Sequence, residues 1–333
     1  MRTDRLFLGI DIGGSSVKLG VVTATGIVCA RRMSQLVTDC GRDAGMDSIF
    51  HEVQRCLSDA GIKAADIRGV GVAAPGTMDP VAGVILHPFN LAGWENLPLR
   101  QIIADGLRAP VVLLNDANAA AYGEFWVGAG REYRSLMLWT LGTGIGGSIV
   151  LDGEVLVGAH AHAAECGHMV IQCNDGPRSD HGIHGSVELF SGARALLRRC
   201  REALNSDRKS LLRDLNANAA LTPTQICAAA EQGDDLALEL ILETARYLAI
   251  GTVNIMHIVN PEIVLFGGAM TFGQNHSSVG RRFMDEIRSR VKAMAFPIPA
   301  AQTRIEYASL GNDAGFIGAA GCALRASQSG PLS

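Results

Sequence analysis

Residues 6–18 read LFLGIDIGGSSVK, and this stretch decides the fold. Its apolar first half ends at Asp11 and at the pair Gly13 and Gly14, and a second, partly β-branched apolar run follows over residues 17–22. Two such runs joined by a glycine corner predict a β-hairpin. Because glycine has no Cβ, the backbone N–H groups of this corner can approach a phosphate closely.

Polar groups around the corner support this interpretation. Ser15 offers a hydroxyl and Lys18 an ammonium group, whereas the carboxylate of Asp11 would repel a phosphate. A carboxylate in this place is suited to hold a divalent cation, or its water shell, beside the phosphates. The alternative is a glycine hairpin with an incidental aspartate, and this segment alone leaves both interpretations open.

Two more glycine turns follow predicted strands. Residues 141–147 read LGTGIGG, in which Thr143 and Gly144 offer a hydroxyl and exposed amides. Gly267 and Gly268 end another apolar run, where they would let a purine or a ribose approach the backbone. Neither a Walker lysine loop nor a dinucleotide fingerprint occurs at a strand-to-helix position. Three turns of this kind together favour a nucleotide site of a different design.

The rest of the chain alternates between helical and strand patterns, which predicts an α/β fold. The hairpin pattern returns at residues 135–151, and this indicates an internal duplication. From residue 188 the chain is expected to be helical through residue 201. The other expected elements are helices at 46–60, 100–107, 118–126, 222–231, 236–259, 279–294 and 314–324, and strands at 70–73, 111–114, 263–266 and around Ile305.

Length and composition set limits on the class of protein. A chain of 333 residues exceeds the usual domain of roughly 100–200 residues, so two lobes around a cleft are expected, with one large α/β domain as the alternative. The net charge of −4, with scattered basic residues, excludes nucleic acid and an anionic membrane as main partners. Eight irregularly spaced cysteines and no N-terminal leader predict a cytoplasmic protein with reduced thiols. No apolar run reaches the roughly 20 residues that cross a bilayer, so no transmembrane segment is expected.

Asn115 and Asp116 stand between a predicted strand and a predicted helix. A carboxylate at a strand end, followed by small alanines, can serve as the general base that accepts the proton of a sugar hydroxyl. The alternative is that Asp116 caps the helix that follows, as aspartates often do.

Other polar residues lie near glycine-rich turns, where they are suited to bind sugar hydroxyls. Glu165 and His168 belong to the segment ECGH, Glu188 opens a predicted helix, and Asn90 lies in HPFNLAGW. Carboxylates and amides can each accept from or donate to neighbouring hydroxyls. Taken singly, each is also compatible with an ordinary surface residue, and His168 with a structural histidine.

Seven segments together resemble the ROK family, a group of sugar kinases and related repressors within the hexokinase-like actin superfamily. In chain order they are DIGGSSVK, GVGVAAPGTMD, HPFNLAGW, NDANAAAYGE, LGTGIGG, ECGH and VLFGGAM. The resemblance implies two actin-like, ribonuclease H-like α/β lobes with mixed sheets around a central cleft. The smaller lobe is expected at residues 1–117, joined by residues 314–325, and the larger at 118–313.

The resemblance also implies roles for single residues. Asp116 is implied as the catalytic base, and a hexose is implied to contact Asn90, Asn115, Asp116, Glu165, His168 and Glu188. ATP is implied to contact Asp11, Gly13, Gly14, Ser15, Lys18, Thr143, Gly144, Gly267 and Gly268. Magnesium is expected with the ATP near Asp11, and a homodimer is the expected assembly.

One departure from the family concerns a zinc site. Family members usually bind zinc through a histidine like His168 and three cysteines, but the matching positions here are Ser179, His181 and Ser186. Without thiolates at these positions, no structural zinc is expected, and hydrogen bonds and packing are expected to hold the loop. A replacement site made of His168, Cys173, His181 and His184 is the alternative, because imidazole and thiolate both bind zinc.

These observations predict an ATP-dependent hexose kinase, with glucose as acceptor and glucose 6-phosphate as product. Fructose, mannose, allose and N-acetylmannosamine are alternative acceptors, and polyphosphate is an alternative donor. A sugar-responsive regulator is the second hypothesis, but no DNA-binding helix-turn-helix is expected ahead of a strand that starts near residue 6. A sugar-binding protein without catalysis is the third, and the presence of Asp11 and Asp116 argues against it.

Overall fold

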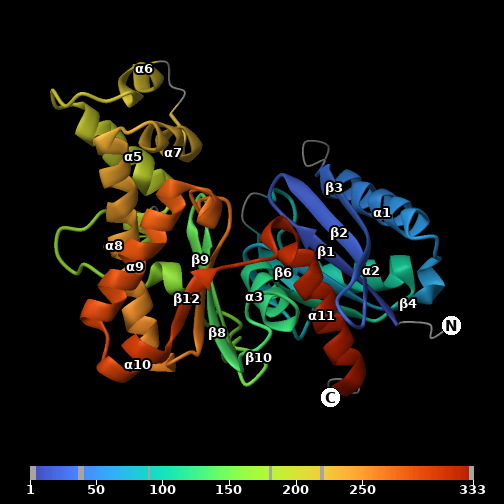
Figure 1. The fold of residues 1–333 in the computed structure, drawn as a ribbon. Helices are drawn as coiled ribbons and strands as arrows, with labels where there is room; N and C mark the ends of the chain where they lie inside the picture. Colours follow the sequence, from blue (N-terminus) through green and yellow to red (C-terminus); the bar gives the residue numbers. More distant parts are fainter. Residues whose placement is uncertain (1–4, 37–40, 89–90, 180–181, 218–220, 330–333) are drawn as a thin grey trace. The chain divides into compact units, whose positions relative to one another are not determined.

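The computed structural model describes residues 5–36, 41–88, 91–179, 182–217 and 221–329, and the chain packs into two compact units (Figure 1). The first unit contains residues 1–134, 149–164 and 309–333, and the second contains residues 135–148 and 165–308. The two ends of the sequence thus belong to one unit. The lobe boundaries expected from the sequence stay a prediction.

A five-stranded sheet with the order β3-β2-β1-β4-β7 forms the centre of the first unit. β1, β2 and β3 are antiparallel neighbours, and β4 and β7 run parallel to β1, so the hairpin predicted at the start of the chain is confirmed. β3 was not foreseen, because its sequence VCARRMSQ is polar and its side chains are at most partly buried. The strands are β1 (Leu6–Ile12), β2 (Ser16–Thr23), β3 (Val28–Gln35), β4 (Ile67–Ala74) and β7 (Val111–Asn115).

A second five-stranded sheet has the order β10-β9-β8-β11-β12. β11 runs parallel to β8 and β12 parallel to β11, while β9 returns beside β8 after three residues, which only an antiparallel pair allows. The topology of the first sheet is thus repeated, as the two hairpin patterns predicted. The strands are β8 (Ser135–Leu141), β9 (Ile145–Leu151), β10 (Glu154–Val155), β11 (Ile263–Gly267) and β12 (Arg304–Tyr307).

Helices cover both faces of the first sheet. α1 (Arg42–Asp59) and α2 (Leu99–Leu107) share a core with Leu8 and Ile10 of β1, whereas α11 (Ala314–Ser329) packs with Phe7 from the opposite face. This division follows from the two-residue period of a strand, which sends neighbouring side chains to opposite faces. α3 (Asp116–Trp126) packs beside α11.

The second unit is rich in helices. The helix expected from residue 188 through 201 is interrupted at Gly192, whose φ of −69° and ψ of 164° are extended, so two helices replace it. No helix in the described part of the chain is both long enough and apolar enough to cross a membrane. The helices are α4 (Val187–Ser191), α5 (Ala193–Leu204), α6 (Leu212–Ala217), α7 (Pro223–Glu231), α8 (Asp235–Val259), α9 (Ser278–Met294) and α10 (Pro297–Gln302).

Short elements connect these layers. β5 (Thr77–Asp79) and β6 (Val84–His87) form a small antiparallel pair. Among the described residues, single turns of 3₁₀ helix are η1 (Ala64–Asp66), η2 (Cys166–His168), η3 (Gln274–His276) and η4 (Gly311–Asp313).

A row of glycines lies beneath α11. Gly9 of β1 is paired with Gly20 of β2 on one side and with Gly71 of β4 on the other. A Cβ added to Gly9 would lie 1.8 Å from the carbonyl oxygen of Phe316, and one added to Gly71 would lie 1.8 Å from that of Ala319. The backbone of α11 therefore rests directly on the strands, and only glycine leaves room for it.

A buried glutamate connects α3 to the segment that enters α11. Glu124 is fully buried, and its carboxylate accepts hydrogen bonds from the amides of Ser309 and Leu310 at 2.9 and 2.7 Å. It also accepts from the Ala129 amide at 2.9 Å and from the Ser309 hydroxyl at 3.0 Å. A buried carboxylate needs such donors to replace water. Glu124 thus places the start of η4 and α11 relative to α3.

The glycine row can be tested with a matched pair of substitutions in β4. Gly71→Ala should lower the free energy of unfolding by about 3 kcal/mol or more, because the new Cβ meets a helix backbone that cannot move aside. Gly69→Ala should stay within about 1 kcal/mol of the wild type, since its Cβ would have only ordinary contacts at 3.6 Å. Urea unfolding measures the free energy of unfolding of both variants. A loss for Gly71→Ala as small as the loss for Gly69→Ala would show that α11 moves aside to admit the new Cβ.

Candidate active site

The carboxyl ends of parallel strands gather the predicted residues of the first unit. Asp11 of β1 pairs with Ala73 of β4, and Ala74 of β4 pairs with Asn115 of β7. With β4 between them, Asp11 and Asn115 are about 10 Å apart across the sheet. Ligands of parallel α/β sheets bind at this edge, so the strand order brings the expected phosphate and sugar residues of this unit to one side.

Asp11 lies in a confined place. Its carboxylate rests over Gly315 of α11, where an added Cβ would lie 2.4 Å from Oδ2, and Lys18 Nζ is 3.7 Å from the same oxygen. Only 15% of the Asp11 side chain is exposed. Burial raises the pKa of Asp11 above its ordinary value, and the charge and hydrogen bond of Lys18 counteract part of that rise. Gly315, which the sequence analysis missed, makes room for this carboxylate.

The corner after β1 is closed by its own backbone. The Gly13 amide donates to the Ser16 carbonyl at 2.8 Å, so this N–H is already engaged within the turn. Gly13 and Gly14 both have negative φ angles, so a left-handed backbone conformation is not the reason for glycine at either position. Ser15 is exposed at the tip of the turn. Gly14 and Ser15 therefore remain the better candidates for donating to a phosphate.

Asn115, rather than Asp116, takes the N-cap position of α3. Asn115 Oδ1 accepts from the amides of Ala117 and Asn118 at 2.9 and 3.4 Å. Asp116 is the first residue of the helix and is half-buried, and its Oδ1 shares the Ala117 amide at 2.8 Å. The helix-capping role that the sequence left open for Asp116 is thus taken mainly by Asn115. Asp116 stands at the positive end of the helix dipole, where a carboxylate is stabilised.

In the second unit, Glu188 lies against the glycine turn between β8 and β9. Its Oε2 accepts the Ile145 amide at 2.8 Å, and a Cβ added to Gly144 would lie 2.3 Å from the same oxygen. The turn is closed by the Gly142 amide, which donates to the Gly144 carbonyl at 3.0 Å. A residue expected to bind sugar and a turn expected to bind phosphate are therefore in direct contact.

The segment ECGH packs against Ile145, the residue that directly follows the same turn. A Cβ on Gly167 would lie 1.8 Å from the Ile145 carbonyl oxygen, so the two backbones touch. This contact places η2, with Glu165 at its N-cap and His168 as its last residue, next to the turn. Cys166 is buried, and burial raises the pKa of its thiol to about 12, so it is unreactive at neutral pH.

Gly267 and Gly268 lie at the carboxyl end of β11, beside the end of β8. Gly267 pairs with Thr140, and a Cβ on Gly268 would lie 2.3 Å from the Leu141 carbonyl oxygen. Gly268 also has a φ of 94°, which favours glycine. The second unit thus brings the two glycine turns expected to bind the nucleotide side by side.

Two predicted residues, Asn90 and His181, lie outside the described residues. The loop that corresponds to the zinc-binding segment of other family members contains several backbone hydrogen bonds. Within the described residues, no group of three or more His, Cys, Asp or Glu side chains is arranged to hold a metal, so His168, Cys173 and His184 do not form one together. The bonds run from Ile171 to Gly185 at 2.8 Å, from Gly185 to Pro177 at 2.9 Å and from Val187 to Met169 at 2.9 Å.

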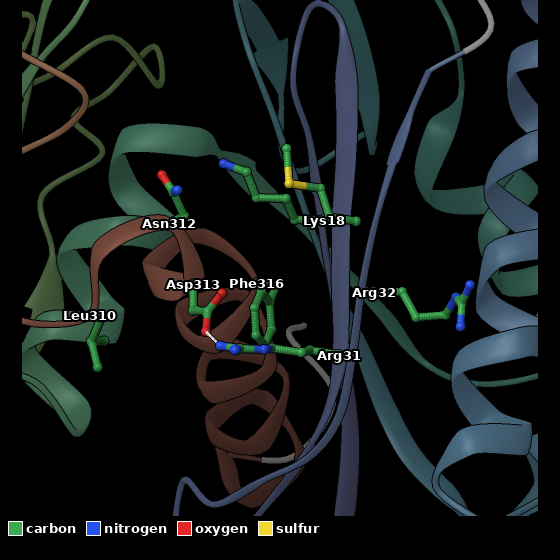
Figure 2. Close-up of a pocket in the computed structure, with 8 residues that line it drawn as sticks. Lys18, Arg31, Arg32, Leu310, Asn312, Asp313 and Phe316 are labelled. Atoms are coloured by element: carbon green, nitrogen blue, oxygen red, sulfur yellow. Dashed lines mark hydrogen bonds and ion pairs between the residues drawn. The ribbon is translucent and has the colours of Figure 1, made fainter.

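A groove of about 490 Å³ lies in the first unit between the strands β2 and β3 and the start of α11 (Figure 2). Of the predicted site residues, Lys18 is the one that lines it. Arg31 is turned toward Asp313, with which it forms an ion pair, whereas Arg32 points away toward α1, where it pairs with Glu52. The basic side chains along this groove are therefore paired with carboxylates.

Comparison with known proteins points to one family. The profile of the ROK family matches residues 7–326. A glucokinase from Halalkalibacterium halodurans is 32% identical over 317 residues, which are 95% of this chain and 94% of that protein. A xylose repressor from Caldicellulosiruptor bescii is 28% identical, over 93% of this chain and 76% of the repressor.

Solved structures agree with this assignment. A ROK hexokinase from Thermus thermophilus matches with a TM-score of 0.81 and 27% identity, covering 98% of this chain and 100% of that one. A ROK family glucokinase from Streptomyces griseus, in complex with glucose and AMPPNP, matches with a TM-score of 0.76 and 28% identity, over 96% and 99% of the two chains. The expected α/β class with actin-like mixed sheets is confirmed.

The burial of Asp11 predicts a pH-dependent gain in stability when its charge is removed. A carboxyl whose pKa is raised on folding destabilises the folded state once it ionises, so the cost is absent below the unfolded pKa and complete above the folded pKa. Asp11→Asn should therefore raise the Tm by a few degrees at neutral pH. The gain should vanish as the pH falls below the ordinary value of 3.8. Calorimetric scans across pH test this, and a lower Tm for Asp11→Asn at neutral pH would contradict it.

Proposed function

Because the chain belongs to the ROK family, we propose that it is an ATP-dependent hexose kinase with glucose as its acceptor and glucose 6-phosphate as its product. The observation that carries the proposal is the arrangement at the start of α3, where Asn115 caps the helix and Asp116 stands in its first turn. A kinase base needs a carboxylate held in place at a site edge. The glucokinase from Streptomyces griseus, crystallised with glucose and an ATP analogue, supports the choice of substrates.

In the proposed reaction Asp116 accepts the proton of the attacking sugar hydroxyl. Phosphoryl transfer needs little covalent help from the protein, so holding the hydroxyl and stabilising charge are the main tasks. The helix dipole of α3 favours the ionised form of Asp116 before the proton arrives. Asn115, Glu165, His168 and Glu188, together with Asn90, are proposed to bind the remaining hydroxyls.

The phosphates are proposed to lie at the two glycine turns. Gly14, Ser15, Thr143 and Gly144 are proposed to offer amides and hydroxyls, with Gly13 shaping the first turn and Lys18 adding positive charge. Gly267 and Gly268 are proposed to contact the adenosine. A carboxylate that is largely buried, with Lys18 as its charge partner, fits contact with the water shell of Mg²⁺, and Asp11 is such a group. When bound, Mg²⁺ supplies charge neutralisation to the phosphates.

Replacing the proposed base tests the mechanism directly. Asp116→Asn should lower kcat by about 100-fold or more, the range expected for loss of a general base, while sugar affinity changes little because the amide keeps most contacts. Coupled measurement of ADP release gives kcat, and calorimetric titration gives affinity. Normal turnover by Asp116→Asn would rule out the proposed role.

One panel of assays identifies the sugar acceptor and the phosphate donor. ADP release with ATP and magnesium is measured for glucose, fructose, mannose, allose and N-acetylmannosamine, and product formation is measured with polyphosphate in place of ATP. A single preferred sugar names the substrate. Sugar binding without turnover by any donor would favour a sugar-responsive regulator, since a relative from Caldicellulosiruptor bescii is a xylose repressor.

We also propose that the enzyme acts as a homodimer in the cytoplasm, as the family resemblance implied. Sedimentation velocity of the purified chain measures the assembly, and a single monomeric species at micromolar concentration would contradict the dimer.

A further inference from the structure

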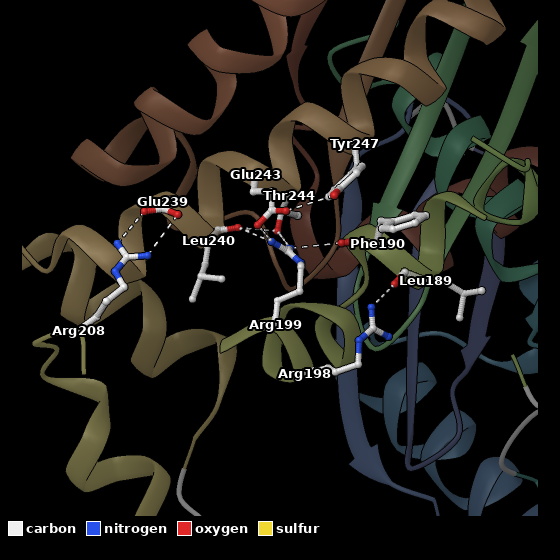
Figure 3. A network of polar contacts seen from close by, with 10 residues as sticks. All are labelled: Leu189, Phe190, Arg198, Arg199, Arg208, Glu239, Leu240, Glu243, Thr244 and Tyr247. Atoms are coloured by element: carbon white, nitrogen blue, oxygen red, sulfur yellow. Dashed lines mark hydrogen bonds and ion pairs between the residues drawn. The ribbon is translucent and has the colours of Figure 1, made fainter. Parts of the chain in front are cut away.

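The helix that carries Glu188 is too short to be stable alone. α4 has five residues, and a helix of that length forms only when tertiary contacts support it. Its last carbonyl groups have no partner within the helix and need outside donors. Arg198 Nη2 donates to the Leu189 carbonyl at 2.9 Å, and Arg199 Nη2 donates to the Phe190 carbonyl at 3.2 Å (Figure 3). Both arginines come from the next helix, α5.

Arg199 is itself fixed by the long helix α8. Its Nη1 donates to Glu243 Oε2 at 2.7 Å and to the Leu240 carbonyl at 3.2 Å, and its Nη2 also donates to Thr244 Oγ1. Only 10% of its side chain is exposed. The guanidinium therefore joins two helices through a buried set of charge-assisted hydrogen bonds, which are stronger than neutral ones.

Aromatic packing closes the same junction. The guanidinium lies over the Tyr247 ring, 5.8 Å from its centre, and Phe190 stacks on Tyr247 with ring centres 4.6 Å apart. Tyr247 also donates to Glu243 Oε1 at 3.2 Å. α4 is thus attached to α8 through a ring contact and through the Arg199 fork.

The other end of α4 touches the glycine turn. Glu188 Oε2 accepts the Ile145 amide at 2.8 Å and fills the space beside Gly144. A chain of direct contacts therefore runs from α8 through Arg199 and the Phe190 carbonyl to Glu188, and from Glu188 to the turn.

We propose that Arg199 is a positioning residue that holds α4 so that the Glu188 carboxylate stays on the Ile145 amide. Its effect on catalysis rests on the proposed kinase function, because Glu188 is there a sugar-binding residue and the turn binds phosphate. Its effect on the Ile145 amide does not depend on any activity. Lysine cannot replace it, because one ammonium group cannot reach both helices in the fork geometry of a guanidinium.

The first experiment measures amide hydrogen exchange by NMR in protein labelled at the isoleucine nitrogens. In Arg199→Lys the Ile145 amide should exchange about 10-fold faster, which corresponds to loss of one charge-assisted hydrogen bond. Ile263, a buried residue of β11, provides an internal reference in the same sample and should keep its exchange rate.

Arg208→Lys is the matched control. Arg208 also pairs with a carboxylate of α8, Glu239, with Nη2 to Oε2 at 2.7 Å, but 42% of its side chain is exposed (Figure 3). Its replacement should leave the Ile145 exchange rate unchanged. Unchanged exchange at Ile145 in folded Arg199→Lys would overturn the proposal, and so would equal acceleration at Ile145 and Ile263, which indicates general destabilisation.

A double-substitution cycle with Glu188→Ala tests the route of the effect. Once Glu188 is removed, adding Arg199→Lys should accelerate Ile145 exchange by less than 2-fold beyond Glu188→Ala alone, since both act through one carboxylate. Fully additive acceleration would overturn the proposal. Where the wild type phosphorylates a sugar, Arg199→Lys should raise the KM for that sugar about 10-fold, and Arg208→Lys should not. A wild type that phosphorylates no sugar would refute the kinase function while leaving the exchange result to decide on Arg199.

Discussion

The backbone of helix α11 lies directly on the strands of the first sheet, and the rest of that unit depends on this contact. Gly9 and Gly71 admit the helix backbone, and Gly20 makes room for the ring of Phe316. In return, the close approach brings Gly315 over the end of β1, where Asp11 is shielded from water. A glycine in a strand interior weakens the strand, so a row of them is retained only where close packing compensates for the loss.

The same principle organises the second unit around the turn between β8 and β9. Gly144 is required by the Glu188 carboxylate, Gly167 by the Ile145 carbonyl and Gly268 by the Leu141 backbone. Gly144 was interpreted from the sequence as an opening for a phosphate and Gly268 as one for a purine or a ribose, yet each already has a neighbour inside the protein. Gly142, whose added Cβ would find its nearest atom at 3.9 Å, is the one in this turn with open space. These motif glycines therefore serve close packing inside the protein, beside the binding role proposed for some of them.

The first unit places two carboxylates, those of Asp11 and Glu124, where burial is unfavourable for stability. Asp11 is largely enclosed, with Lys18 as its partner, and burial raises its pKa, whereas Glu124 is fully buried but has four donors. This difference in hydrogen-bond donors distinguishes the two residues. Glu124 is a structural carboxylate whose lone pairs are satisfied inside the protein, whereas Asp11 is suited to contact a ligand. Local departures from good packing and pairing are expected at functional sites.

The sequence by itself determined the α/β class, the two hairpins, nearly all of the long helices and the family, because hydrophobic periodicity and short glycine motifs are local properties of the chain. It also placed Asp11, Asp116 and Glu188 at the ends of the correct elements. Only the tertiary structure decided that Asn115 is the cap of α3, that Gly315 faces Asp11 and that Glu188 touches the Ile145 amide. It alone revealed β3, whose polar pattern gives little signal, and the break at Gly192. Arg199 contacts Phe190, and Glu188 contacts Ile145, although the two residues of each pair belong to different helices or strands. Such contacts arise from packing, which no local sequence pattern encodes.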